Sequence, residues 1–408
     1  MRRLILHIGP FNTGTSSFQH WLRGNAAVLA DAGLVLPLDL LNANANGAPL
    51  AHAFLAAPED RTAEQSDLVD RFGQFCAAHP DASVILSAER LSQMLLVDGS
   101  FLNEFDPDED DTRRQRAARH LHDAVSTLGF DRIDLLVLIR EQAGFLTSAY
   151  VQKLKTMNAR LDLGARGLEA FPVQRYAESF RQLSDLGFHV IAAPYHSPDR
   201  ALALPERLMA MAGFDGPLKG RVTCDVPRVN VSPGYLTTIG LGHVFWHLET
   251  LSPTPDAAGA DQLRRRLFAI TRAANVEGDG PLTLFAPDQA AAIAARQRRH
   301  LDGIEPWAQG LTAADIAGSF PAHRAQSPLS RNDLGTHERH RIDQWLRGIA
   351  AQVQRDNRLR QLIDPATLSD LDASPPGVHS APQQTTPCLG GIWAAAAPDG
   401  RRPLRQAL

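Results

Sequence analysis

The beginning of the chain joins a short apolar run, a glycine-rich turn and an amphipathic segment. Residues 4–8 are almost continuously apolar, which is typical of a strand buried on both faces. Residues 9–14 form the turn, and beyond it apolar side chains recur at helical spacing at Phe18, Trp21 and Leu22. In such a strand, loop and helix, backbone N–H groups and the positive end of the helix dipole converge. The stretch therefore predicts a site for a phosphate or a sulfate group.

The turn has the glycine spacing of a Walker A motif, with one difference. The pattern runs from Gly9 to Gly14-Thr15-Ser16, and Thr15 stands where the motif carries the lysine that reaches the β- and γ-phosphates. An ordinary ATPase or kinase would lack this cation, so that class is disfavoured. For this stretch taken alone, a strand-to-helix turn that binds no ligand stays open as the alternative.

Further apolar runs alternate with helical periodicity along the first half of the chain. The runs lie at residues 33–37, 83–91, 133–139 and 188–193, and helical patterns at residues 64–79 and 205–211. This alternation predicts a three-layer α/β fold with a mostly parallel sheet and a P-loop-like first strand, loop and helix. Ligands bind such sheets at the carboxyl ends of the strands. Glu89 lies where the run at residues 83–91 becomes polar, and Arg140 follows the run at residues 133–139, so we expect both to lie near the loop of residues 9–14.

Composition excludes several classes of protein. The chain has 408 residues, of which 44% are hydrophobic and 21% charged, and a net charge of −4. These values are ordinary for a globular protein and give no reason to expect a nucleic acid as partner. The three cysteines are widely separated, so neither a disulfide framework nor a structural zinc site is expected. No apolar run is long enough for a membrane span, and we expect a cytoplasmic protein.

The second half of the chain differs in pattern from the first. Helical periodicity dominates residues 230–363, as an addition to the α/β part. Residues 364–408 are rich in Pro, Ala, Ser, Gly and Gln, which predicts a disordered tail. We therefore expect one α/β domain over residues 1–363 followed by the tail.

No metal site is expected. Residues 104–111 carry six acidic side chains, but they are followed by arginines, which is typical of a solvated helix start. His243 and His247 have a spacing that can bind zinc, yet the glutamate of the H-E-x-x-H motif and a third ligand are missing. We expect His7 to be packed in the first strand, and His337 and His340 to face solvent.

A second anion-binding element lies at Arg140 and Ser148, eight residues apart, where a guanidinium and a hydroxyl can grip one anion. Together with the first loop, this element resembles the PAPS-dependent sulfotransferases, and in particular their bacterial branch. In that family a strand, loop and helix hold the 5′-phosphosulfate of 3′-phosphoadenosine 5′-phosphosulfate (PAPS), and an R-x7-S element holds the 3′-phosphate. The first motif is matched by Thr13, Gly14, Thr15, Ser16 and Ser17, and the second by Arg140 and Ser148.

Two weaker motifs extend the resemblance over about residues 4–300. Residues 87–89 resemble the family's S-x-E element, and residues 228–232 its later N-x-S stretch. The resemblance implies transfer of a sulfuryl group from PAPS to an acceptor hydroxyl, of a carbohydrate or another small metabolite. It also implies that Glu89 is the general base, with Ser87 helping to orient it, and that no metal is needed.

The sequence departs from the family at Asn12, where the family has a lysine. That lysine lies on the oxygen that bridges phosphate and sulfur, and Asn12 can donate a hydrogen bond there but carries no charge. Lys153 and Lys155, shortly after Ser148, are the alternative cations. The alternative hypothesis is a catalytically degenerate protein that binds a nucleotide, or a partner, without turnover.

Overall fold

A computed structural model of the chain describes most of the α/β part and several later helices. The side chains of residues 107–111, 149 and 152–157 are not described. The described residues are 1–9, 14–97, 107–157, 174–196, 203–222, 234–242, 266, 269, 270, 276, 279–320, 327 and 334–356. The predicted tail at residues 364–408 lies outside this set.

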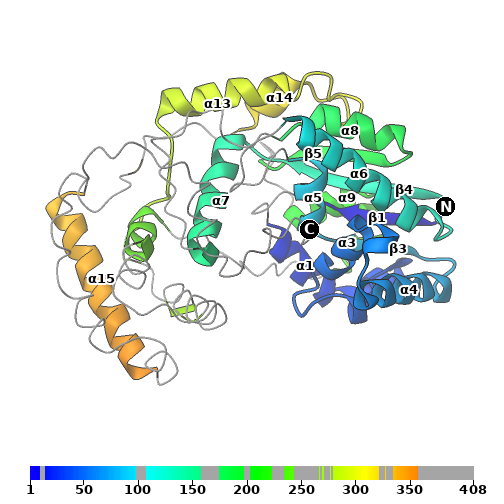
Figure 1. Cartoon of the computed structure of the whole chain (residues 1–408), viewed down its shortest axis with the longest axis horizontal. Coiled ribbons are helices and arrows are strands. Elements are labelled where there is room, and N and C mark those ends of the chain that lie inside the picture. Colours follow the sequence, from blue (N-terminus) through cyan, green and yellow to red (C-terminus); the bar gives the residue numbers. More distant parts are fainter. Residues whose placement is uncertain are drawn as a thin grey trace, which may run out of the picture.

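Five parallel strands form one sheet (Figure 1). Their order is β2-β3-β1-β4-β5, and neighbouring strands in this sheet pair in parallel. The strands are β1 (Arg3–His7), β2 (Leu34–Val35), β3 (Ser83–Ser87), β4 (Arg132–Ile139) and β5 (His189–Pro194). Each strand overlaps a predicted apolar run, and the predicted three-layer α/β fold with a mostly parallel sheet is confirmed.

Strand β1 lies at the centre of the sheet and fixes which strand ends are neighbours. Its last residue, His7, is in register with Ser87 of β3 on one side and Leu136 of β4 on the other. The ladder continues beyond the strand ends, because the Ile8 N–H donates to Leu136 O (3.0 Å) and the Ala88 N–H donates to His7 O (3.0 Å). The segments that follow β1, β3 and β4 therefore leave the sheet side by side.

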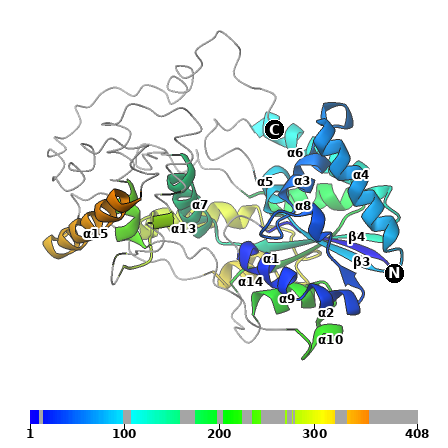
Figure 2. The same cartoon turned by 90° about the horizontal axis from the view of Figure 1, so that it is seen from below.

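Helices cover both faces of the sheet, so the molecule has three layers (Figure 2). Successive strand residues such as Ile5 and Leu6 point to opposite faces, as the pleat requires. One face packs against α3 (Ala48–Leu55), α4 (Ala63–Ala78), α5 (Glu89–Leu95), α6 (Pro107–Ser126) and α8 (Tyr176–Asp185). The other packs against α1 (Thr15–Gly24), α2 (Ala26–Asp31), α9 (Leu204–Met211) and α10 (Asp215–Leu218).

The remaining helices form two smaller apolar clusters. Helix α7 (Gln142–Met157) packs against α13 (Pro287–Arg299) through Phe145, Leu146 and Ile293. Helix α15 (Thr336–Arg355) packs on residues 234–242 in a separate cluster, and α14 (Ala313–Gly318) packs Ile316 onto the sheet cluster. Among the described residues, no helix is both long and apolar enough to cross a membrane.

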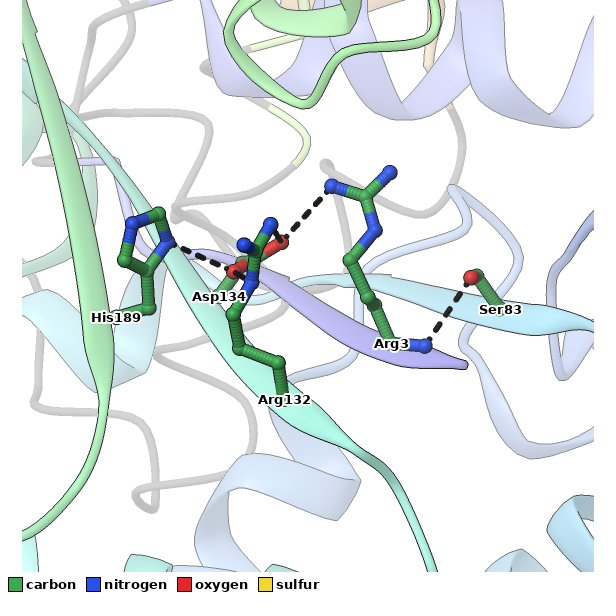
Figure 3. Close-up of polar contacts among 5 residues, drawn as sticks. All are labelled: Arg3, Ser83, Arg132, Asp134 and His189. Carbon is green, nitrogen blue, oxygen red and sulfur yellow. Dashed lines mark hydrogen bonds and ion pairs between the residues drawn. The ribbon is translucent and has the colours of Figure 1, made fainter. Parts of the chain in front are cut away.

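A buried carboxylate ties three strands together at the amino end of the sheet (Figure 3). Asp134 of β4 is fully buried and accepts hydrogen bonds from Arg132 Nε (2.6 Å) and Arg3 Nη1 (3.1 Å). Its Oδ1 also lies 2.9 Å from Nδ1 of His189. Since Arg3, Arg132 and His189 are the first residues of β1, β4 and β5, this cluster lies at the edge opposite the carboxyl ends.

Candidate functional site

Helix α1 begins directly after the predicted anion-binding loop. Gly14 is its N-cap, with a left-handed φ of 75°, and a Cβ atom there would lie 2.5 Å from the Leu204 side chain. The Phe18 N–H donates to Gly14 O (3.0 Å) in the first turn, which holds no acidic residue. An α-helix N-terminus of this kind favours an anion. Ser16 and Ser17 are half-buried in this turn, whereas Asn12 and Thr13 lie outside the described residues.

Thr15 and Glu89 are brought together from β1 and β3. Glu89 is the first residue of α5, two residues after the end of β3, and the Thr15 side chain hydrogen-bonds to its carboxyl group. The pKa of Glu89 is raised to about 7, because the effect of burial outweighs the hydrogen bond from Thr15, which lowers the pKa. A carboxyl group that titrates near neutral pH is suited to accept and release a proton.

Ser87 does not orient Glu89, so this expectation is wrong. Its hydroxyl lies 2.9 Å from Nδ1 of His7 and accepts a hydrogen bond from Gln19 Nε2 (3.2 Å). The reason is the end of the strand: Ser87 still belongs to β3 and is fully buried, whereas the chain turns into α5 at Glu89. His7 is packed as expected, and burial lowers its pKa to about 3, so its imidazole is neutral at pH 7.

Arg140 and Ser148 form the second pair, at the carboxyl end of β4. Arg140 Nη2 donates to Ser148 Oγ at 2.8 Å, from the second turn of α7. The guanidinium carbon lies 5.6 Å from the ring centroid of Tyr195, which follows β5. Burial lowers the pKa of Arg140, and nearby Tyr195, Glu141 and Tyr176 raise it. An arginine stays protonated at neutral pH in proteins, so the pair presents a positive charge beside a hydroxyl.

A distant glutamine holds the turn that carries Arg140. Gln297 of α13 is fully buried, and its Nε2 donates to Arg140 O (2.8 Å) while its Oε1 accepts from the Gln142 N–H (2.9 Å). Glu141 caps the start of α7 by accepting a hydrogen bond from the Gly144 N–H (2.7 Å). The sequence analysis missed Gln297, for which no local pattern gives a signal, and Tyr195, whose position just after a predicted strand is a signal.

The two pairs lie at the same edge of the sheet. Thr15 and Glu89 follow β1 and β3, Arg140 follows β4, and β1 lies between β3 and β4. The arrangement offers two places for negative charge, the start of α1 and the Arg140–Ser148 pair, with a titratable carboxyl group beside the first. This is a suitable donor set for a ligand with two separated anionic groups.

Several other predicted positions lie outside the part of the structure that is described. These are the side chains of Lys153 and Lys155, residues 228–232, and the pair His243 and His247. His337 and His340 are exposed, as expected. Within the described residues, no group of three or more His, Cys, Asp or Glu side chains is arranged to hold a metal ion.

Comparison with known proteins assigns no family to this arrangement. No protein-family model matches the sequence, and neither the curated proteins nor the solved structures contain a significant match.

Proposed function

We propose that this chain is a PAPS-dependent sulfotransferase that transfers a sulfuryl group to the hydroxyl group of a carbohydrate or another small metabolite, in the cytoplasm. The observation that carries the proposal is the 2.8 Å hydrogen bond between Arg140 and Ser148, at the strand end next to the one that leads into α1. The sequence resemblance assigns this pair to the 3′-phosphate of the nucleotide and the start of α1 to its 5′-phosphosulfate.

The donor groups fit such a nucleotide. The Arg140 guanidinium can form charge-assisted hydrogen bonds to a phosphate, and Ser148 adds a directional bond from the same side. At the other end, the start of α1 carries Thr15, Ser16 and Ser17 and has no acidic side chain that would repel an anion. Tyr195 lies against the guanidinium and restricts its orientation.

Glu89 is the base in this proposal. The chemistry that PAPS supplies is an activated sulfuryl group, which an acceptor oxygen displaces in line as 3′-phosphoadenosine 5′-phosphate (PAP) leaves. Glu89 accepts the proton of the acceptor hydroxyl, so that the new S–O bond forms without a positive charge on oxygen. With a pKa of about 7, the carboxyl group is substantially ionised at neutral pH and basic enough to take the proton.

The identity of residue 12 favours a second candidate function. Asn12 provides no positive charge for the departing phosphate, and one lost electrostatic donor typically costs about 100- to 1000-fold in rate. A chain that keeps Arg140 and Ser148 but has lost turnover would act as a nucleotide-binding protein. Both functions require nucleotide binding, and only turnover separates them.

The test is calorimetric titration with PAP, comparing the wild type with Arg140→Ala and Ser148→Ala. We expect micromolar binding by the wild type, a loss of about 100-fold in Arg140→Ala and a smaller loss in Ser148→Ala, since a charge-assisted bond is roughly twice as strong as a neutral one. Arg221→Ala, in an exposed pair with Asp31, is the matched control and should bind like the wild type. Wild-type protein that does not bind PAP would overturn both candidate functions.

Turnover of PAPS by the wild type and by Asn12→Lys then decides between them. Sulfate transfer by the wild type establishes an enzyme that works without the lysine. Activity in Asn12→Lys alone establishes the degenerate binder.

A further inference from the structure

A basic pocket lies beside the first turn of α5. It has a volume of about 400 Å³ and lies between α3, α5, α6 and the start of α4. Its polar lining includes His52, Asp60, Gln65, Arg90, Arg113 and Arg116. Pockets of roughly 300–1000 Å³ are the usual size for small-molecule ligands, so a sugar or a similar metabolite fits this one.

The topology places this pocket on the same side of the sheet as the candidate site. Helix α6 ends at Ser126, shortly before β4 begins at Arg132, so its early turns lie towards the carboxyl ends of the strands. Figure 2 shows α3, α5 and α6 gathered on one face of the sheet. Arg90 directly follows Glu89 in the first turn of α5. The first turn of α5 therefore carries both a residue that lines the pocket, Arg90, and the proposed base, Glu89.

Positive charge dominates the described lining. Arg90, Arg113 and Arg116 line the pocket, against one described carboxylate, that of Asp60. The two histidines of the lining are His52 and His120. Hydrogen bonds hold two of the guanidinium groups in place: Arg90 Nη1 donates to Gln93 Oε1 (2.6 Å) and Arg113 Nη2 to Val97 O (3.2 Å).

The basic groups are close enough to influence one another. Burial lowers the pKa of Arg90, and the neighbouring charge of Arg113 lowers it further. Burial likewise lowers the pKa of His52, with a further contribution from Arg90. An anion bound between cations that converge on one pocket reduces the electrostatic repulsion among them.

We propose that the pocket binds an oxyanion of the acceptor, a carboxylate or a phosphate, through Arg90 and Arg116, and so turns the acceptor hydroxyl towards Glu89. The role as an acceptor site rests on the proposed sulfotransferase function, whereas the anion site itself rests on the residues of the pocket. A neutral sugar offers these arginines no charged partner, so the substrate class is an acidic or phosphorylated sugar, or a hydroxy acid of similar size.

Binding of matched sugars to the full chain tests the site. Saturation-transfer NMR, with and without PAP, compares glucose with glucuronate and with glucose 6-phosphate. We expect both anionic sugars to bind at least tenfold more tightly than glucose, and the stronger of the two identifies the oxyanion. Arg90→Gln and Arg116→Gln should each lose this preference by about tenfold. Arg119→Gln, an exposed residue of α6 outside the pocket, is the control that keeps it.

Two results would overturn the pocket proposal. One is equal binding of glucose and the anionic sugars, and the other is an anion preference that survives both Arg90→Gln and Arg116→Gln. PAP binding measured on the same samples keeps the two proposals apart. If PAP binds and the sugars show no preference, the proposed nucleotide site stands and the pocket proposal fails. If the anionic sugars bind through Arg90 and PAP does not bind, the anion site stands and its role in sulfate transfer fails.

Discussion

Glu89 is the residue on which the chemistry of the proposed site depends. It lies half-buried at the start of α5 and is hydrogen-bonded to the Thr15 side chain, and its pKa is raised to about 7. A base must be ionised to accept a proton, so activity should rise with pH through about 7 and level off above it. This pH dependence follows from the burial of one carboxyl group.

Glu89→Gln tests this role. We expect kcat to fall by about 100- to 10,000-fold, since the amide cannot accept the proton, and the rise in rate through pH 7 to disappear. PAP affinity should stay within a few-fold of the wild type. Glu64→Gln, which changes an exposed carboxyl group of α4, is the matched control. Full activity in Glu89→Gln, or an unchanged pH profile, would rule out Glu89 as the base. The assay uses whichever of the wild type and Asn12→Lys turns over.

At this scale the sequence predicted the Arg140–Ser148 pair, and it selected Thr15 and Glu89 without predicting the hydrogen bond between them. Glu89, Thr15 and Arg140 could be selected because each stands next to a strand end or a helix start, and Ser148 could be selected from its spacing after Arg140. Gln297 could not be selected, because its partners at Arg140 and Gln142 are distant in the chain. The Ser87 error has a local origin. The residue at which a strand ends decides the partners of the side chains there, and the apolar run at residues 83–91 did not mark the end of β3 at Ser87.

Helix α1 depends on one glycine at its start. Gly14 adopts a left-handed φ of 75°, which costs an L-residue about 1 kcal/mol, and a Cβ atom there would press on Leu204 of α9. The same residue sets the direction in which the first turn of α1 faces the proposed phosphosulfate site.

Gly14→Ala should therefore destabilise the chain by about 1–2 kcal/mol and weaken PAP binding. Gly24→Ala is the control within the same helix, because nothing lies within 4 Å of its Cβ position and its φ is not left-handed. It should leave the stability and PAP binding close to those of the wild type. Urea unfolding gives the stability, and the double variant Gly14→Ala/Leu204→Ala separates the contact from the backbone strain. Equal effects of Gly14→Ala and Gly24→Ala would contradict this account of the turn.

The elements themselves were predictable, and their arrangement was not. All five strands coincide with apolar runs, because parallel strands buried on both faces need near-continuous apolar sequence. The strand order and the division of the helices between the two faces depend on contacts between distant segments, which no local pattern records.

In the molecule as a whole, the two ends of the sheet have different roles. The carboxyl ends carry the proposed site, and the amino ends are joined by Asp134 with Arg3, Arg132 and His189 (Figure 3). Removing one partner from a buried ion pair leaves the others uncompensated, which typically costs about 3–5 kcal/mol. The cluster is therefore expected to matter for stability and not for ligand binding.

Asp134→Asn should lower the free energy of unfolding by about 3 kcal/mol, measured by urea denaturation, while PAP binding to the folded protein stays unchanged. The matched control is Asp31→Asn, because Asp31 pairs with Arg221 at 3.4 Å on the surface. An exposed pair contributes little, so this control should unfold at nearly the wild-type urea concentration. A midpoint for Asp134→Asn that equals that of Asp31→Asn would show that the cluster is not a stabilising feature.

The contact between Gln297 and the Arg140 turn has a consequence for how the chain matures. A ribosome completes the last strand of the sheet at Pro194 long before it adds Gln297. While synthesis continues, the sheet can form, but the backbone carbonyl of Arg140 and the amide of Gln142 still exchange their hydrogen bonds with water. The turn that carries Arg140 is therefore completed only after Gln297 has been added. A nascent chain released before residue 297 would lack these two hydrogen bonds, and it would also lack the contacts that Trp307 and Ile316 make with the sheet layer.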